Sequence, residues 1–232
     1  MVAKRTAWDE LNRRIVACRD CARLVAHCQT IARVKRAAYR DWEYWGRPVP
    51  NFGDANGRAL LVGLAPGAHG SNRTGQMFTG DASGEWLFRA LHKAGFANKP
   101  NALSIDDGLQ LIDCAITAAV HCAPPDNMPT TVEKAACRPW LDETLDLSSA
   151  RVFIALGGLA WNELVGQFRR RGWYEGKTPK FGHEELVALT DGRWLLGSYH
   201  PSRQNTNTGR LTENMLDSVF AKARTLMTRA SR

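Results

Sequence analysis

The sequence lacks the long apolar runs that membrane-spanning and exported proteins carry. No stretch of its 232 residues approaches the roughly 18 apolar residues that a membrane span needs. Its first residues, MVAKRTAWDELNRRIVAC, lack the apolar centre of a secretory signal peptide. Internal repeats and low-complexity tracts are also missing. We therefore expect one folded domain over residues 1–232, in the cytoplasm and without a membrane anchor.

Two nucleotide-binding signatures are missing as well. The Gly-rich segment GLAPGAHGSNRTGQMFTGDASG (residues 63–84) has neither the Gly-Lys-Ser/Thr ending of a phosphate-binding loop nor the glycine spacing of a dinucleotide fold. An enzyme that uses nucleoside triphosphates with magnesium is an alternative for this loop. The lysine that such a site expects is not there, which disfavours this alternative.

Positive charge is what the chain has in excess. It carries 31 Lys and Arg against 23 Asp and Glu, a formal net charge of +8. Basic residues are dense over residues 31–40 (IARVKRAAYR), over residues 167–173 (QFRRRGW) and at the C-terminus. A polyanion such as DNA is the partner that this balance favours, because neutralised phosphates release counterions. A merely solubilising surface is the other interpretation of the same charge.

Four short apolar runs alternate with helical patterns. The runs RALLVGLA, CAITAAV, ARVFIALG and RWLLGSYH begin at Arg58, Cys114, Ala150 and Arg193. Such alternation predicts an α/β fold with a central, parallel four-stranded sheet and helices on both faces. Helices are expected from Ser83 to Gly95, after a Thr130–Glu133 capping box, over residues 158–168 and at the C-terminus. Thr6 is expected to cap a first helix, and a second helix is expected to run through Arg40.

Unusual residues follow three of the four predicted strands. Ligands bind beyond the carboxyl ends of strands in open α/β sheets, so these three loops should meet in one cleft. Phe78 is an aromatic residue that can stack on a planar base or plug the loop from beneath. Asp81 can act in catalysis or cap the next helix. His200, at a strand end, can donate a hydrogen bond to an anionic leaving group.

The cysteines have the spacing of a metal site. Cys18 and Cys21 form a C-x2-C pair, and Cys122 and Cys137 enclose 14 residues. Four thiolates suit either zinc or an iron–sulfur cluster, and spacing alone leaves both open. Cys114 falls in a predicted strand and is expected to be a buried core thiol, and Cys28 is not expected to be a ligand.

From Cys18 to HPSRQNTNTG, the chain resembles the family-5, B-type uracil-DNA glycosylases of the uracil-DNA glycosylase superfamily. The residues that carry this resemblance are GLAPGAHGSNRTGQMFTGDASG, TAAVHCAPPDN and HPSRQNTNTG. It implies a three-layer α/β/α sandwich and a structural [4Fe–4S] cluster. The implied cluster ligands are Cys18, Cys21, Cys122 and Cys137. It also implies a monomeric base-excision-repair enzyme, bacterial or archaeal and nucleoid-associated.

The resemblance further implies three groups of site residues. The catalytic ones are Asp81, Asn127 and His200. The substrate-binding ones are Gly63, Ala65, His69, Asn72, Phe78 and Gly80. The DNA-binding ones are Pro201, Ser202, Arg203, Asn205 and Asn207.

Two positions depart from the uracil-specific members of the superfamily. Ala65 stands where the best-known members carry a water-activating Asp, an apolar position that the type-5 family shares. This leaves open which group activates the water, and the resemblance makes Asp81 the candidate. Ala118 stands near the place of a base-reading Asn, for which Asn127 is the substitute. Without a fixed amide reader, substrate choice should widen from uracil to hypoxanthine and xanthine.

The resemblance implies hydrolysis of the N-glycosidic bond of a base flipped out of DNA. The last loop is expected to wedge into the groove, His200 to stabilise the departing base, and Asp81 to orient water. The three loops contain no lysine for a Schiff base, so an abasic site without strand cleavage is the expected product. A non-catalytic nucleic-acid-binding module with a structural metal is the alternative. It would leave the three strand-end loops without a purpose.

Overall fold

The computed structural model describes residues 2–228, in which four apolar segments pair as parallel strands. These strands are β2 (Ala59–Gly63), β3 (Cys114–Ala118), β4 (Val152–Leu156) and β6 (Trp194–Ser198). Every residue of β2, β3 and β4 is buried. Their unbroken apolar sequence is what a strand covered on both faces requires. The predicted parallel four-stranded centre of the sheet is confirmed.

Two short antiparallel strands extend the sheet at its edges, which sequence analysis did not predict. β1 (Phe52–Gly53) pairs with β3, and β5 (Leu186–Ala188) pairs with β6. The strand order in the six-stranded sheet is β1-β3-β2-β4-β6-β5. Segments of two and three residues are too short to show a period of two, so their positions come from pairing with a neighbour.

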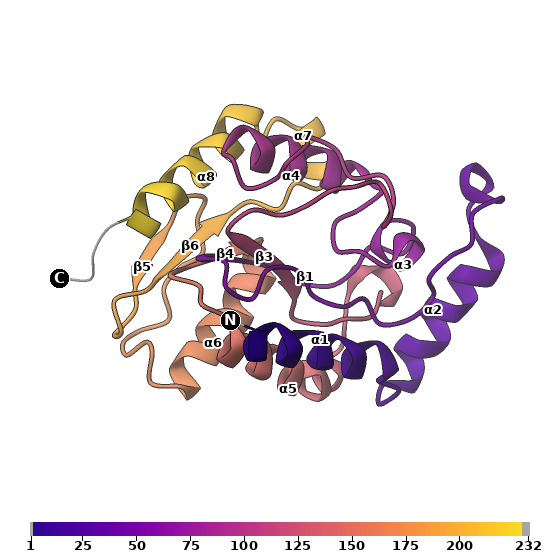
Figure 1. Ribbon diagram of the computed structural model, residues 1–232, viewed down its shortest axis with the longest axis horizontal. Helices are drawn as coiled ribbons and strands as arrows, with labels where there is room; N and C mark the ends of the chain where they lie inside the picture. Colours follow the sequence, from indigo (N-terminus) through magenta and orange to yellow (C-terminus); the bar gives the residue numbers. More distant parts are fainter. Residues whose placement is uncertain (1, 229–232) are drawn as a thin grey trace.

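Helices cover both faces of the sheet (Figure 1), as an α/β/α sandwich requires. One face carries α4 (Ala82–Lys93) and α8 (Glu213–Thr228), packed on a core that includes Phe88 and Phe220. The other carries α1 (Val2–Ala17), α5 (Thr131–Leu147) and α6 (Gly158–Arg170), around a core that includes Phe153 and Trp161. Among the described residues, no helix has both the length and the apolar character to cross a membrane.

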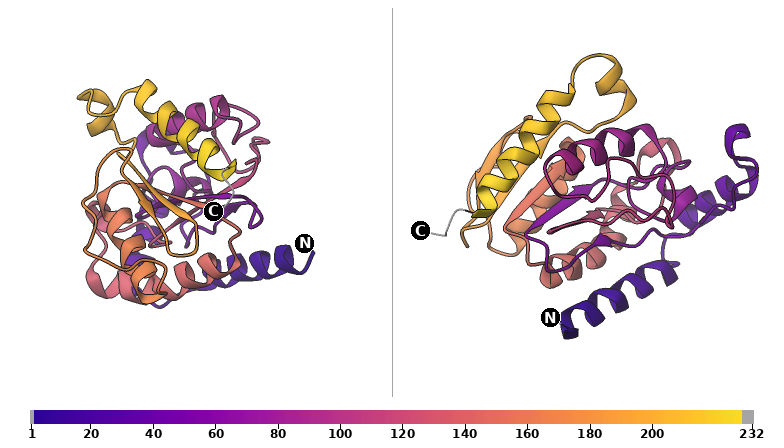
Figure 2. Two further views of the ribbon diagram at one scale, coloured as in Figure 1. Left: turned by 90° about the vertical axis from the view of Figure 1, so that its left-hand side faces the viewer. Right: turned by 45° about the horizontal axis from the view of Figure 1, so that its top comes forward.

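The remaining helices are short or lie outside these layers. They are α2 (Ala22–Val34), η1 (Ala37–Tyr39), α3 (Ser71–Thr74), η2 (Pro125–Asn127) and α7 (Arg203–Asn207). Figure 2 shows α2 and the turn after it projecting from the body of the molecule.

Helix boundaries agree with the sequence in most places. The Thr130–Glu133 capping box is confirmed. Thr6 lies inside α1 and does not cap it, so that prediction was wrong. The second helix ends at Val34, six residues before Arg40, and a 3₁₀ turn follows. The polar segment after β6, predicted as a loop, contains the short helix α7, which Ser202 caps.

One ion pair ties α2 to the sheet-covering helix α5. Arg23 donates from Nε and Nη2 to the two carboxylate oxygens of Glu133, each at 2.7 Å. Glu133 also accepts from the backbone N–H of Thr130 at 2.7 Å, which closes the capping box. The Arg23 guanidinium lowers the pKa of Glu133 to about 2. A charged Glu133 therefore stabilises both the helix start and the attachment of α2.

We predict that Glu133→Gln lowers the free energy of unfolding at pH 7 by about 1 kcal/mol, because the amide can keep the capping box but loses the charge-assisted hydrogen bonds from Arg23. The folded-state pKa of Glu133 lies below its ordinary value of 4.5, so its contribution is complete above that value. It is lost as the pH falls towards 2, so the difference between wild type and variant should shrink. Urea unfolding from pH 7 downward measures it. Glu10→Gln, at an exposed ion pair on α1, is the control and should change little. An equal effect of both variants would contradict the prediction.

Candidate active site

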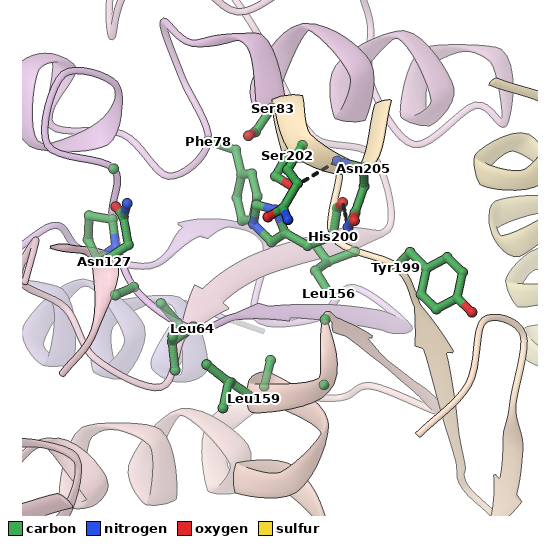
Figure 3. A pocket seen from close by; sticks show the side chains of 18 of the residues that line it. Leu64, Phe78, Ser83, Asn127, Leu156, Leu159, Tyr199, His200, Ser202 and Asn205 are labelled. Carbon is green, nitrogen blue, oxygen red and sulfur yellow. Dashed lines mark hydrogen bonds between the residues drawn. The ribbon is translucent and has the colours of Figure 1, made fainter. Parts of the chain in front are cut away.

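A cavity of about 710 Å³ opens at the carboxyl ends of the parallel strands. Loops after β2, β3, β4 and β6 all contribute to its lining. Phe78, Asn127 and His200, predicted to meet from three separate loops, all line it (Figure 3). The convergence expected from the strand order is therefore present in the structure.

Phe78 is held in a strained backbone conformation at the cavity wall. Its φ is +57°, a region that bulky side chains rarely adopt. The hydroxyl of Ser71 accepts from the Phe78 N–H at 2.9 Å. A Cβ on Gly63 would lie 3.1 Å from the Phe78 ring, and one on Gly84 would lie 1.7 Å from its carbonyl oxygen. These close approaches fix the ring, whose centroid lies 5.8 Å from that of His200.

Asp81 caps α4, as predicted, and it also lines the cavity. Its Oδ1 accepts from the Gly84 N–H at 3.0 Å, at the start of α4. Its other carboxylate oxygen lies against Gly67 and Gly70, where added Cβ atoms would come within 3.1 and 2.0 Å. Burial raises the pKa of Asp81, while the N–H groups of α4 and the charge of Arg73 oppose this. Among the described residues that line the cavity, Asp81 is the only one with a carboxylate.

His200 is a neutral imidazole at the end of β6. Burial lowers its pKa to about 4, so the ring is uncharged near pH 7. Its backbone carbonyl accepts from the Ser202 N–H at 2.8 Å and from the Asn205 amide at 2.9 Å. The start of α7 therefore fixes the backbone of His200, while its ring faces the cavity beside Phe78 (Figure 3).

Asn127 reaches the cavity from a tight turn. It ends η2, and both Asp126 and Asn127 have positive φ, at +54° and +57°. Asn and Asp tolerate this conformation better than other side chains do. The turn leaves Asn127 exposed at the cavity rim. Ala118, at the end of β3, also lines the cavity and offers only a methyl group there.

Four of the predicted substrate-binding residues support the cavity without lining it. Gly63 gives room to the Phe78 ring. The amide of Asn72 donates to the Cys28 and Ala68 carbonyls, and His69 Nδ1 lies 3.1 Å from the Tyr44 hydroxyl. Gly80 accepts through its carbonyl from Arg73 at 2.6 Å. Ala65, in contrast, lines the cavity as predicted, together with Phe78.

The predicted DNA-binding residues divide in the same way. Ser202 and Asn205 line the cavity, and Pro201 is buried behind them. Arg203 and Asn207 are exposed on α7, at the edge of the cavity.

Sequence analysis missed two parts of the site. The loop after β4 forms a cavity wall with Leu156, Gly157 and Leu159, and two glycines directly after an apolar strand were the available signal.

Arg73 is the second part. It is only 3% exposed and has no acidic partner within ion-pair distance among the described residues. It donates to the His69 and Gly80 carbonyls, at 2.8 and 2.6 Å, and so braces the loop that carries Phe78 and Asp81. Nothing in the local sequence marked this role.

The four cysteines predicted as ligands line one small cavity beneath α2. Cys18 and Cys21 come from the α1–α2 junction, Cys122 from the loop after β3, and Cys137 from α5. Burial raises the pKa of Cys137 to about 12, and its sulfur accepts from the His121 N–H at 3.4 Å. Within residues 2–228, no three His, Cys, Asp or Glu side chains form a group that could hold a single metal ion. Cys114 is fully buried in β3, as expected of a core thiol.

Comparison with known proteins assigns the chain to a family. The uracil DNA glycosylase superfamily matches residues 50–224, a span that contains all four cavity loops. The chain belongs to this superfamily, in its type-5 family. It is 50% identical to the type-5 uracil-DNA glycosylase of Mycobacterium leprae over 219 residues, covering 94% of each chain. It is 50% identical to that of Thermus thermophilus over 213 residues, covering 91% of this chain and 94% of the relative. A type-4 enzyme of Pyrobaculum aerophilum is 32% identical over 161 residues, 69% of this chain and 74% of the relative.

Membership of the type-5 family confirms the resemblance that the three loop segments carried. It also confirms the α/β fold, whose sheet has four parallel central strands and two antiparallel edges. The superfamily match begins after Cys18 and Cys21, so the two N-terminal thiols lie outside it. In this type-5 protein, the residues that line the cavity come from the matched part of the chain.

The contact between Gly70 and Asp81 generates a prediction about stability. A Cβ at Gly70 would lie 2.0 Å from the Asp81 carboxylate, so Gly70→Ala must displace this capping side chain. We expect the free energy of unfolding to fall by about 2 kcal/mol, as for other overpacked positions. Urea unfolding measures this loss.

Gly166→Ala in α6 is the matched control. Its added methyl would meet only the flexible Arg170 side chain, at 3.4 Å, and alanine favours a helix interior. Its free energy of unfolding should stay the same or rise. If Gly70→Ala is as stable as this control, Asp81 is not held as the structure shows.

Proposed function

We propose that this type-5 family member is a monofunctional uracil-DNA glycosylase that acts as a monomer in base excision repair. It hydrolyses the N-glycosidic bond of uracil in DNA and leaves an abasic site. The observation that carries the proposal is the single cavity that Phe78, Asp81, Asn127 and His200 share. An aromatic ring, a carboxylate and a neutral imidazole around one space supply what this reaction needs. The names of its type-5 relatives agree with the proposal.

Binding begins with the extruded base. Flipping a base costs a few kcal/mol, and least at a mismatch, which favours deaminated bases. The cavity has a volume of about 710 Å³, enough for a nucleobase with part of its sugar. The Phe78 ring is held rigidly by Ser71, Gly63 and Gly84, and offers a flat face for stacking. Arg203, exposed on α7, is placed to meet the DNA backbone or groove.

Bond cleavage then separates charge between the base and the sugar. His200 is neutral near pH 7 and can donate a hydrogen bond to the departing base anion. Asp81 offsets the positive charge that develops on the deoxyribose, and it orients the attacking water. The described residues that line the cavity include no lysine, so no amine is available there for a Schiff base. Cleavage therefore stops at the abasic site.

The substrate range extends beyond uracil in this proposal, to hypoxanthine and xanthine. Ala118 gives the end of β3 no amide with which to read one particular base. Asn127 offers an amide instead, from the exposed η2 turn, which is less rigid than a strand end. The cavity also has more volume than a pyrimidine needs. These features support acceptance of a purine as well as uracil.

We predict that wild type releases the base from duplexes with a single uracil, hypoxanthine or xanthine, and from no undamaged duplex. His200→Ala and Asp81→Asn should each slow single-turnover release by about a hundredfold or more, since each removes a preorganised stabiliser. The rate of wild type should fall at acid pH as Asp81 is protonated, at a pKa above its ordinary value of 3.8. Asp81→Asn should lose this dependence.

His92→Ala is the control for these variants, because His92 lies on the exposed end of α4 and does not line the cavity. It should excise bases at the wild-type rate. Wild-type rates from His200→Ala and Asp81→Asn would exclude both residues from the mechanism. Duplex binding by wild type without any base release would identify a non-catalytic binding module instead.

A structural [4Fe–4S] cluster is also part of the proposal. A cluster of this type takes four cysteine thiolates, one at each iron atom, so its ligands surround a space and do not meet at a point. Cys18, Cys21, Cys122 and Cys137 are placed in this way around one cavity. The His121 N–H already points at the Cys137 sulfur, an interaction that commonly supports a thiolate ligand. When bound, the group would join α1, α2, α5 and the loop after β3.

We predict that anaerobically purified protein is brown, absorbs broadly near about 400 nm, and holds about four iron and four sulfide per chain. Cys137→Ser should lower the iron content and the absorbance strongly, because it removes one of the four ligands. Cys114→Ser is the control, since this thiol is buried in β3 away from the other four, and it should retain the iron. A colourless preparation that contains zinc would refute the cluster.

A further inference from the structure

A basic arm projects from the molecule beside the candidate active site. It comprises residues 31–47, from the end of α2 through η1 to the loop before β1. The arm carries five Lys and Arg against two Asp and Glu. Figure 1 and Figure 2 show it standing out from the body next to α3, which α2 contacts.

Three arginines of the arm are free to bind an anion. Arg33, Arg36 and Arg40 are exposed. Among the residues that the structure describes, none of these guanidinium groups has a carboxylate within ion-pair distance. Several other cations are paired with carboxylates, as Arg89 and Lys93 are with Asp217. The unpaired arginines leave a net positive surface.

The arm is fixed to the loop that carries the site residues. The Arg73 guanidinium lies 3.9 Å from the ring centroid of Tyr39 and 4.0 Å from that of Trp42. Two backbone hydrogen bonds, of 2.9 and 3.0 Å, run from Trp45 and Gly46 to the carbonyls of Arg73 and Asn72. These contacts give the arm a defined position, which a mobile solvated segment would not have.

The arm also lies close to the cavity. Arg36 is near enough to His69 for its charge to contribute to the lowered pKa of this histidine. His69 lies two residues after Gly67, which lines the cavity. Phosphates that flank a nucleotide in the cavity would therefore meet the arm from one side, while α7 contributes Arg203 from another loop.

We propose that residues 31–47 form a second contact surface for the phosphate backbone of duplex DNA. The inference rests on the proposed function, since it is the extruded base that places the duplex beside the arm. Arg33, Arg36 and Arg40 bind phosphates without reading sequence. Arg73 links this contact to the site, because the guanidinium that stacks on Tyr39 and Trp42 also donates to the Gly80 carbonyl, next to Asp81.

The test is the salt dependence of DNA binding by the triple variant Arg33→Gln, Arg36→Gln, Arg40→Gln. The probe is a fluorescent duplex with a tetrahydrofuran abasic analogue, which the protein cannot cleave, and the measurement is anisotropy over a range of KCl concentrations. We expect Kd at about 0.1 M salt to rise about tenfold or more. The slope of log Kd against log[KCl] should fall by about 2 to 3, roughly one for each phosphate contact.

The matched control replaces three exposed arginines elsewhere, Arg5, Arg151 and Arg170, with Gln. Arg151 lies before β4, at the opposite end of the sheet from the cavity, and the control should keep the wild-type slope. The arm variant should also keep its single-turnover rate at saturating DNA, since it leaves the cavity intact. An arm variant with the wild-type salt slope, or equal losses in both triples, would overturn the proposal. Failure of wild type to release any base would overturn the proposed function instead.

Discussion

The candidate site depends on the close packing of one loop, residues 63–84, against its own backbone. The Asp81 carboxylate fits only because Gly70 has no side chain, and the Phe78 carbonyl fits only because Gly84 has none. This packing holds Phe78 at a φ of +57°, which an aromatic residue would not adopt in a relaxed loop. The glycines of the sequence are therefore needed for close approach within the protein, and not for wrapping a nucleotide phosphate. This explains why the loop is Gly-rich yet has neither phosphate-binding signature.

Burial around this loop shifts the pKa values of both Asp81 and His200. The same desolvation that keeps His200 neutral raises the pKa of Asp81, so the two groups are driven towards their uncharged forms. For His200 this outcome leaves one ring N–H, which the proposed mechanism uses to donate a hydrogen bond to the departing base. For Asp81 it would be harmful, and the N–H groups of α4 with the positive charge of Arg73 oppose it. A buried arginine without a paired carboxylate is thus part of the electrostatics of the site.

The sequence predicted those features that depend on neighbouring residues or on burial of whole segments. The central strands were evident because burial on both faces demands continuous apolar runs, and the Thr130–Glu133 box because its two bonds span three residues. The edge strands β1 and β5 were missed because two or three residues carry no measurable period. Arg73 was missed because its partners Tyr39 and Trp42 lie more than 30 residues away in the chain. The cavity wall after β4 was missed because two glycines after an apolar strand were its signal, and glycine and leucine have no reactive side chain to add to it.

The cysteine site and the basic arm are parts of one arrangement. Cys21 is the N-cap residue of α2, and α2 leads directly into the arm. Cys122 stands five positions before Asn127, in the loop that reaches the cavity from β3. A group bound by these two cysteines would connect the start of α2 to the loop that carries Asn127, while Arg73 connects the arm to the loop that carries Phe78 and Asp81. With such a group bound, the cavity would be braced from two sides by segments outside the sheet. A structural cluster would then act on catalysis through the positions of Asn127 and the arm, with no redox step required.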